Sequence, residues 1–220
     1  MLFFGVTVRG SVFILLILSS LLVSCAPGMK ELTGMILDPS DADRRREGIV
    51  ALSQHPRGLD EQPCKLYANV AANPREDVNV RAAAVDALGR SGRTEHCGGV
   101  AALLEDPSDL LRWRAAVALD TLPGEAAIEP LRKHALSDRL LDVRVAATQA
   151  LRHYRRQDVA YTLLGCLNDR DFSIRFKAHG SLVQVTGQDL GYRPGDWRDL
   201  LDTLPPSPPD EEGEAAKGET

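Results

Sequence analysis

One nine-residue pattern recurs along this chain, and its spacing constrains the fold more strongly than any other feature. Each copy starts with a branched apolar residue and an arginine, has a small residue three positions after that arginine, and ends with a small residue followed by leucine. Four copies start at Val80, Leu111, Val143 and Ile174, so the period is 31 or 32 residues. A period in this range is typical of a solenoid, in which every repeat is one supersecondary unit.

A fifth, degenerate copy precedes these four at residues 41–52. Arg45 takes its arginine position and Gly48 its small position, whereas Arg44 stands where the branched apolar residue belongs. A polar residue there suits a terminal repeat, whose outer face meets water. Between the copies, glycines and prolines in the turns mark helix ends, and further helices are expected at 62–73, 95–105, 125–137 and 156–168. The sequence therefore predicts an all-α fold, an α–α superhelix of about five helical hairpins over residues 38–203.

Each arginine-bearing helix carries one apolar stripe. In the first full copy Val80, Ala84, Ala87 and Leu88 lie within about 100° of one another at 3.6 residues per turn, and the other copies repeat this arrangement. The small residues let neighbouring helices approach closely, while the branched residue and the leucine fill the core. One hairpin cannot bury this stripe alone, so we expect neighbouring hairpins to stack and bury it continuously.

Residues 1–24 have the composition of a targeting segment. Arg9 is their only charged residue, and residues 12–23 are almost continuously apolar. An apolar stretch of this kind, with small residues before a cleavage point, predicts a secretory signal peptide. An ordinary signal peptide that is cut elsewhere and an uncleaved anchor are the alternatives to the lipoprotein signal considered next.

The residues Leu22-Val23-Ser24-Cys25 resemble the lipobox of bacterial lipoproteins. This resemblance implies that Cys25 is lipidated and becomes the first residue of the mature chain, with residues 25–37 as a lipidated tether. By the same resemblance, Ala26 implies the outer membrane, on its periplasmic side, if the cell has one. Two or three acyl chains give stable attachment, so we expect a lipid-anchored membrane protein of the bacterial cell envelope.

The repeat period breaks at residues 186–197, where glycine, proline and aspartate are frequent. We interpret this stretch as a C-terminal cap, with Tyr192 and Trp197 over the open end of the last hairpin, because a solenoid needs capped ends. A binding site is the alternative. Residues 204–220 are rich in proline and then in acidic residues, which predicts a disordered acidic tail.

The pattern Val-Arg-x-x-Ala-x-x-Ala-Leu resembles HEAT repeats, and in particular the short HEAT-like repeats of the phycobilisome lyases. The resemblance covers about residues 38–203 and implies an α–α superhelix whose second helices line its concave face. It also implies a scaffold that holds other proteins, because most HEAT-repeat proteins are scaffolds.

Repeated arginines and aspartates form the first candidate functional set. Each aspartate precedes an arginine of the pattern by six residues, at the turn inside a hairpin. Such residues can pair within or between hairpins through charge-assisted hydrogen bonds. We interpret the set as a structural ladder, with an anion-binding groove as the functional alternative. The set comprises Arg81, Arg112, Arg144, Arg175, Asp106, Asp138 and Asp169.

Apolar residues next to the repeated arginines form the second candidate set. Trp113, Val117, Val145 and Phe176 lie opposite the core stripe and would make an apolar strip on the concave side. Large exposed apolar patches tend to mark interfaces, and tryptophan is favoured at their centres. The strip therefore predicts a protein-binding surface. The alternative is that tight superhelical curvature buries these side chains against the neighbouring second helix.

Cys64 and Cys97 lie 33 residues apart, about one repeat, and each stands near the start of a predicted first helix. Stacked helices have axes about 8–10 Å apart, and a disulfide needs Cα atoms about 5.5–6 Å apart. Export would place both residues where disulfides form. We predict a Cys64–Cys97 disulfide, with two free thiols as the alternative.

No residue constellation indicates catalysis, a cofactor or a metal ion. The five histidines are not spaced as paired ligands, and neither a phosphate-binding loop nor a catalytic triad is visible. With a net charge of −5 and no lysine-rich run, nothing indicates nucleic acid as a partner.

We therefore expect a non-enzymatic scaffold that is lipid-anchored in the envelope and binds another, unidentified envelope protein through its concave face. Neither a cofactor nor a metal is expected. Two alternatives stay open: an enzyme or enzyme accessory of the bilin-lyase kind, and a purely structural envelope component.

Overall fold

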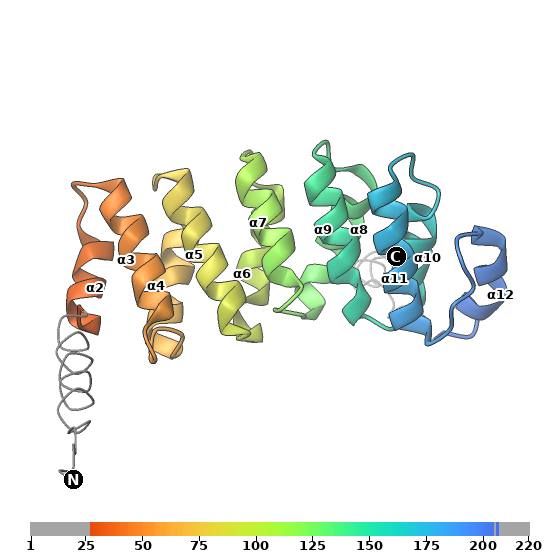
Figure 1. Ribbon diagram of the computed structural model, residues 1–220, viewed down its shortest axis with the longest axis horizontal. Coiled ribbons are helices and arrows are strands. Elements are labelled where there is room, and N and C mark those ends of the chain that lie inside the picture. The colour runs from red at the N-terminus through yellow and green to blue at the C-terminus, as the bar shows by residue number, and fades with distance from the viewer. Residues whose placement is uncertain (1–26, 205, 207–220) are drawn as a thin grey trace, which may run out of the picture.

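The computed structural model describes residues 27–204 and 206, and in these residues helices are the only regular secondary structure. They pair into five hairpins that stand side by side along one axis (Figure 1). The all-α solenoid predicted from the repeat period is confirmed. Residues 1–26, with the predicted signal peptide and Cys25, and most of the predicted tail lie outside the described residues. Within the described part, no helix is long and apolar enough to cross a membrane.

The two helices of each hairpin form separate layers. The first helices are α2 (Met29–Leu37), α4 (Glu61–Ala72), α6 (Cys97–Ala102), α8 (Ile128–Ser137) and α10 (Gln157–Cys166). The second helices are α3 (Ala42–Gln54), α5 (Val78–Ser91), α7 (Asp109–Leu119), α9 (Leu141–Ala150) and α11 (Phe172–Thr186). Short 3-10 turns extend α6, α8 and α9: η1 (Thr94–His96), η2 (Leu103–Glu105), η3 (Glu125–Ala127) and η4 (Leu151–His153). With these turns included, the helices between the copies match the expected segments to within two residues.

The solenoid begins one helix earlier than predicted. Residues 29–37 form α2 and not the tether that we expected over residues 25–37. Leu32 and Ile36 lie one turn apart on one face of α2 and are buried in the core, where α2 packs against α3. This helix has no arginine-containing pattern, which belongs to second helices only. The start predicted at residue 38 was wrong for that reason.

Aspartates cap several second helices. The carboxylates of Asp41, Asp77 and Asp171 accept hydrogen bonds from backbone N–H groups in the first turns of α3, α5 and α11. Such bonds satisfy donors that have no partner inside the helix. At the other end of α11, Gly187 adopts a left-handed conformation with φ of 80°, which favours glycine as a helix stop.

Consecutive second helices contact one another along the whole row, from α3 to α11. We call each of these contacts a joint. In the joint between α5 and α7, a Cβ on Gly89 would lie 3.0 Å from Ala118 Cβ, and Thr121 Oγ1 donates a hydrogen bond to the Gly89 carbonyl at 2.7 Å. The predicted stripe positions are buried in all four full copies. Small residues thus set the spacing of the row, as the pattern indicates.

The stretch interpreted as a cap covers part of the last hairpin. It contains η5 (Pro194–Trp197), and α12 (Arg198–Leu201) follows directly after it; both pack on α10 at the far end of the row (Figure 1). Trp197 is fully buried, and its indole N–H donates to the Gly191 carbonyl at 2.9 Å. The Tyr192 ring stacks on His179 of α11, with centroids 4.4 Å apart, but stays partly exposed.

Candidate functional site

Each ladder arginine in the middle of the row bonds to two consecutive repeats. Arg112 donates to the backbone carbonyl of Asp106, in its own hairpin, at 3.1 Å. It also donates to the carboxylate of Asp138, in the next hairpin, at 2.9 Å. Arg144 repeats this arrangement, with the Asp138 carbonyl at 3.0 Å and the Asp169 carboxylate at 3.7 Å. The ion pairs of the ladder therefore run between hairpins and tie each repeat to its successor.

The ladder aspartates also shape the turns in which they lie. The second carboxylate oxygen accepts a hydrogen bond from the backbone N–H two residues later. In this way Asp106 binds Ser108, Asp138 binds Leu140 and Asp169 binds Asp171, at 2.8–2.9 Å. One aspartate thus closes its own turn and holds the arginine of the preceding repeat, which accounts for both residue types at one period.

The second hairpin departs from this rule, and sequence reasoning missed the substitute. Asn73 takes the aspartate position there, and its neutral side chain closes the turn by accepting from the Arg75 N–H. Arg45 of the preceding repeat instead pairs with Glu76, at 2.7 Å. The signal was present, because Asn73 cannot form an ion pair and Glu76 is the next acidic residue in that turn.

Arg81 follows Asn73 by eight residues, whereas each ladder aspartate precedes the arginine of its own hairpin by six. Its Nε donates to the carbonyl of Ala71, at the end of α4, and not to the turn residue. Its link to the next repeat is the usual one, with the Asp106 carboxylate at 2.8 Å. Two extra residues in the turn therefore change only the bond inside the hairpin.

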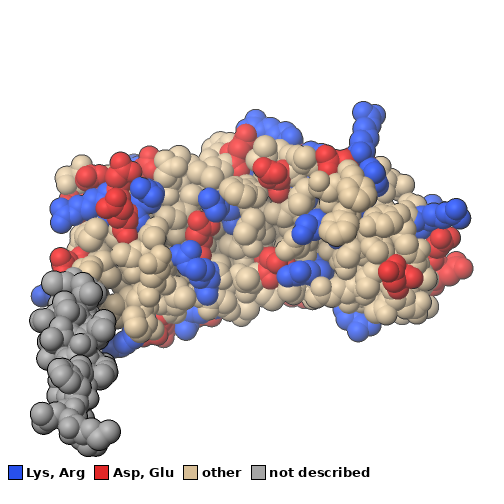
Figure 2. Space-filling view, viewed as in Figure 1, with Lys and Arg blue, Asp and Glu red and all other residues tan. Residues whose placement is uncertain are grey.

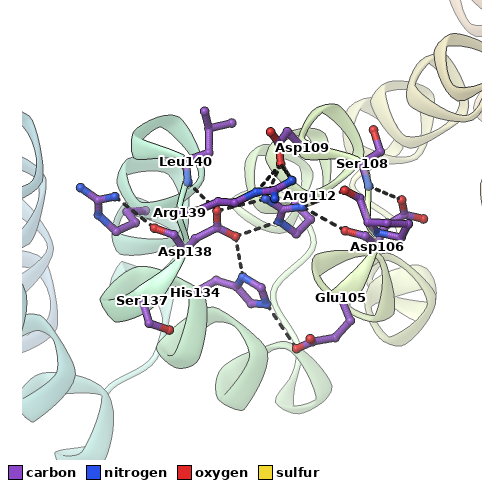
Figure 3. Close-up of polar contacts among 12 residues, drawn as sticks. Glu105, Asp106, Ser108, Asp109, Arg112, His134, Ser137, Asp138, Arg139 and Leu140 are labelled. Carbon is purple, nitrogen blue, oxygen red and sulfur yellow. Dashed lines mark hydrogen bonds and ion pairs between the residues drawn. The ribbon is translucent and has the colours of Figure 1, made fainter.

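Asp138 is the most buried carboxylate of the ladder and the centre of a polar network (Figure 3). It accepts hydrogen bonds from Arg112 and from the Leu140 N–H, and its Oδ2 lies 2.8 Å from His134 Nδ1. Burial alone would raise the pKa of Asp138, but these three hydrogen bonds outweigh it and lower the pKa to about 2. The carboxylate is therefore ionised and fully engaged.

His134 extends this network to the outer layer, and sequence reasoning did not single it out. Its Nε2 lies 3.2 Å from a carboxylate oxygen of Glu105 (Figure 3). The same oxygen accepts a hydrogen bond from Lys133 at 2.8 Å. Both ring nitrogens of His134 thus face carboxylates. The available signal was its position four residues before Asp138 on one helix face. The network links α8 to the hairpin before it.

The predicted apolar strip is not one continuous exposed surface. Trp113 and Val145 are half-buried and pack on the core, whereas Val117 is 45% and Phe176 is 53% exposed. Ala82, Trp113 and Val145, which follow the first three ladder arginines, are buried or half-buried, and only Phe176, which follows the last one, is exposed. Trp113 and Val145 are thus half-buried, which agrees with the alternative that curvature covers these side chains. Val117 and Phe176 are exposed, which agrees with the predicted strip.

A polar cluster separates the two exposed apolar residues. Asp120, at the end of α7, accepts from Gln149 at 3.0 Å and from Arg152 at 2.8 Å, and His153 Nε2 lies 3.0 Å away. On the face drawn in Figure 2, basic and acidic side chains are likewise interspersed. The second-helix face therefore offers short apolar spots between paired charges.

Shallow clefts follow the joints on this face. The cleft between α5 and α7 has a volume of about 330 Å³ and is lined by Asp86, Arg114 and Val117 among others. Arg114 pairs with Asp86 at 3.4 Å and lies over the Trp113 ring at 4.5 Å. Burial raises the pKa of Asp86, and Arg114 and Arg90 offset this only in part. A second cleft, between α9 and α11, includes Phe176 in its lining.

The predicted Cys64–Cys97 disulfide is wrong in this structure, where both thiols are free and buried. The Cys64 thiol donates to the Leu59 carbonyl, in the bend before its own helix, at 3.4 Å. The sulfur of Cys97 instead points forward to Gly124 of the following repeat. The repeat spacing placed the two helices correctly side by side, but the two sulfurs point away from each other. Burial raises the pKa of both thiols.

Among residues 27–204 and 206, no three His, Cys, Asp or Glu side chains gather closely enough to hold a metal ion. Cys166 lies in an apolar setting that raises its pKa to about 11.

Comparison with known proteins agrees with this architecture. Residues 69–152 match the family model described as HEAT repeats. No curated protein matches the chain. Among solved structures, the chain is similar to the complex of CpcE and CpcF of phycocyanin lyase from Nostoc sp. PCC7120, with 18% identity and a TM-score of 0.63, over 74% of this chain and 66% of that chain.

The Escherichia coli protein YibA is also similar, with 22% identity and a TM-score of 0.56, over 70% of this chain and 58% of that chain. The chain thus spans less than two thirds of either relative. At these identities the likeness shows a shared fold, the HEAT-like α–α solenoid.

Proposed function

We propose that the protein is a lipid-anchored scaffold of the bacterial cell envelope that holds another envelope protein on its second-helix face. One observation carries the proposal. The face is a row of helices locked in place by the ladder, and Val117 stands exposed on it between charged pairs. Apolar spots with a polar surround are typical of interfaces. The solved CpcE structure, which shares the fold, is itself a complex of two proteins.

A pair of matched variants tests the docking face. Val117→Asp places a charge on the second-helix face, and Leu136→Asp places the same charge on α8, where Leu136 is 54% exposed. In pull-downs from solubilised, crosslinked membranes, we expect Val117→Asp to lose a stoichiometric partner that Leu136→Asp and the unmodified chain retain. Both variants should keep the melting temperature. Equal recovery by the two variants would exclude this face.

The anchoring is tested separately, because the proposal for Cys25 rests on the resemblance to a lipobox. Cells fed an alkyne-labelled palmitate should yield a labelled protein, and Cys25→Ser should abolish both the label and the membrane association. A labelled Cys25→Ser protein would contradict lipidation at this residue.

A second candidate function is an accessory to an enzyme of the bilin-lyase kind. The likeness to the phycocyanin lyase complex favours it, as does the short form of the repeat. This function predicts a bound chromophore, which absorption and mass spectra of the purified protein would detect. A colourless protein that does not bind added bilin would remove this candidate.

A further inference from the structure

Every other second helix packs one of its sides against the next second helix. In the last second helix, α11, the corresponding side has no such helix against it in the described residues. By the repeat register, Phe176 corresponds to Ala82, Trp113 and Val145, which are buried or half-buried. Phe172 corresponds likewise to Leu141, which is half-buried, whereas Phe172 is 62% exposed. Its ring lies 6.1 Å from that of Phe176. The two rings thus form an apolar patch on the side of α11 where the next joint would be.

The ladder is also incomplete at this helix. Arg175 donates to the carbonyls of Asp169 and Arg170 at 2.9 Å, as Arg112 and Arg144 do to carbonyls in the turns of their own hairpins. In the earlier repeats a carboxylate of the next repeat completes the arrangement. Within residues 27–204, no carboxylate lies at ion-pair distance from Arg175, and its guanidinium stands 5.6 Å from the centre of the Phe172 ring. The apolar patch therefore lies beside an arginine that lacks the carboxylate partner found in the earlier repeats.

The cap determines the size of element that can cover this patch. η5 and α12 pack on α10, and so they take the place of the next first helix (Figure 1). A second copy of this chain would need that place for its own α2. Beside α11, in the place of the next second helix, the segment before η5 contributes the Tyr192 ring, which stacks on His179 and lies 6.5 Å from the Phe172 ring, and Asp189, which pairs with His179. The opening therefore fits a single helix and not a whole solenoid.

We propose that one α-helix of a protein partner occupies this opening and serves as the missing second helix. The existing joints define its chemistry. A carboxylate in the turn before the helix pairs with Arg175, as Asp138 pairs with Arg112. A small residue twelve positions later lies against α11, as Ala118, twelve residues after Asp106, lies against Gly89 of α5. This docking depends neither on the location in the envelope nor on Val117. An experiment can therefore refute it without refuting the proposed function, and the reverse.

The probe is a copy of the helix that covers α7: a synthetic peptide of residues 138–153, with a hydrocarbon staple between positions 141 and 145. The staple is needed because isolated helices of this length are marginal in water. By the repeat register these two positions correspond to Phe172 and Phe176, on the side of the helix away from α7. We expect the full-length mature chain to bind the labelled peptide saturably in fluorescence anisotropy.

Four variants decide between docking in the opening and unspecific adhesion. Arg175→Ala and the peptide change Asp138→Asn should each weaken binding about tenfold, and together no more than either alone, because they remove the same ion pair. Phe172→Ser, at an exposed position, should weaken binding without lowering the melting temperature. Arg139→Ala, an exposed arginine in an internal turn, should have no effect.

Absence of saturable binding, or equal binding by the Arg175→Ala and Arg139→Ala chains, would overturn the proposal. The acidic residues of the chain's own tail are a competing occupant. If the peptide binds only after Asp210→Asn, Glu211→Gln and Glu212→Gln in the full chain, the tail covers the patch and the proposal is also overturned.

Discussion

At the scale of single residues, Asp138 shows how much one side chain contributes to a joint. It closes the turn before α9, receives Arg112 from the preceding repeat and faces His134 from the outer layer. A buried ion pair adds little over a well-packed apolar pair, but removing one partner leaves the other charge buried without compensation. The cost of breaking the ladder should therefore depend on burial and not on the number of bonds.

Asp138→Asn tests this dependence. The change leaves Arg112 without its buried counter-charge, and we expect a loss of about 3–5 kcal/mol in the free energy of unfolding. Asp109→Asn is the matched control, because Asp109 also pairs with Arg112 but is half exposed. The control should lose less than about 1 kcal/mol. Urea unfolding followed by circular dichroism measures both, and equal losses would contradict the role of burial.

The pKa of Asp138 predicts a dependence of stability on pH. The folded-state pKa of about 2 lies below the unfolded value of about 3.9. The group therefore stabilises the fold fully above pH 4 to 5, and this contribution, about 2 kcal/mol, is lost as the pH falls through 2. Unfolding curves between pH 7 and pH 2 should lose this increment in the unmodified chain and not in Asp138→Asn. Parallel curves for the two proteins would contradict the assignment.

At the scale of elements, the helices depend on small residues where they meet. Gly89 lies where α5 and α7 approach closely, so a branched side chain there must push the two helices apart. Overpacking of this kind costs about 1–3 kcal/mol.

Gly89→Val should lower the free energy of unfolding by about that amount more than Gly99→Val does. Gly99 lies in α6, with nothing within 4 Å of its added Cβ, and it provides the cost of valine in a helix without the clash. Thermal or urea unfolding measures the difference. If the two variants lose the same stability, the close approach at Gly89 does not limit the joint.

The first helix provides a second prediction at this scale. If α2 is an integral helix of the solenoid, Leu32→Ala removes a buried side chain and should cost about 2–4 kcal/mol. Leu37→Ala, in the same helix but 63% exposed, should cost less than about 0.5 kcal/mol. Two near-neutral variants would restore the tether interpretation of this segment.

Periodicity and side-chain direction explain which elements could be predicted from the sequence. The period located the second helices, their buried stripe and the segments between them, because the same positions are buried in each repeat. It could not find α2, which lacks the pattern, or Glu76, which replaces a turn aspartate out of register. Spacing placed Cys64 and Cys97 on adjacent helices but carried no information on where their sulfurs point. Similarly, the joints that half-bury Trp113 arise from how the helices stack.

At the scale of the whole molecule, each repeat of the described residues packs against its neighbours, and Arg81, Arg112 and Arg144 each reach one repeat ahead. Stability should then behave as a sum over repeats and joints. Deletion of residues 107–138 removes one whole period and places Asp106 six residues before Arg144. We expect this shortened chain to fold, with unchanged helicity per residue and a lower urea midpoint.

The matched control removes half a period, residues 107–122, and joins helices out of register. This chain should lose cooperative unfolding, as measured by circular dichroism in urea. Two equally well-folded deletions would show that the joints do not depend on register.

In the ladder, one aspartate both closes its own turn and forms an ion pair with the arginine of the preceding repeat. This double role has a consequence for how such a chain can evolve. Because the same arginine–aspartate pair forms at the three joints from α5 to α11, duplication or loss of a genetic segment of one unit there creates no mismatch at the new boundary. The protein can thus lengthen or shorten by recombination, and its reach can evolve without any redesign of its interior.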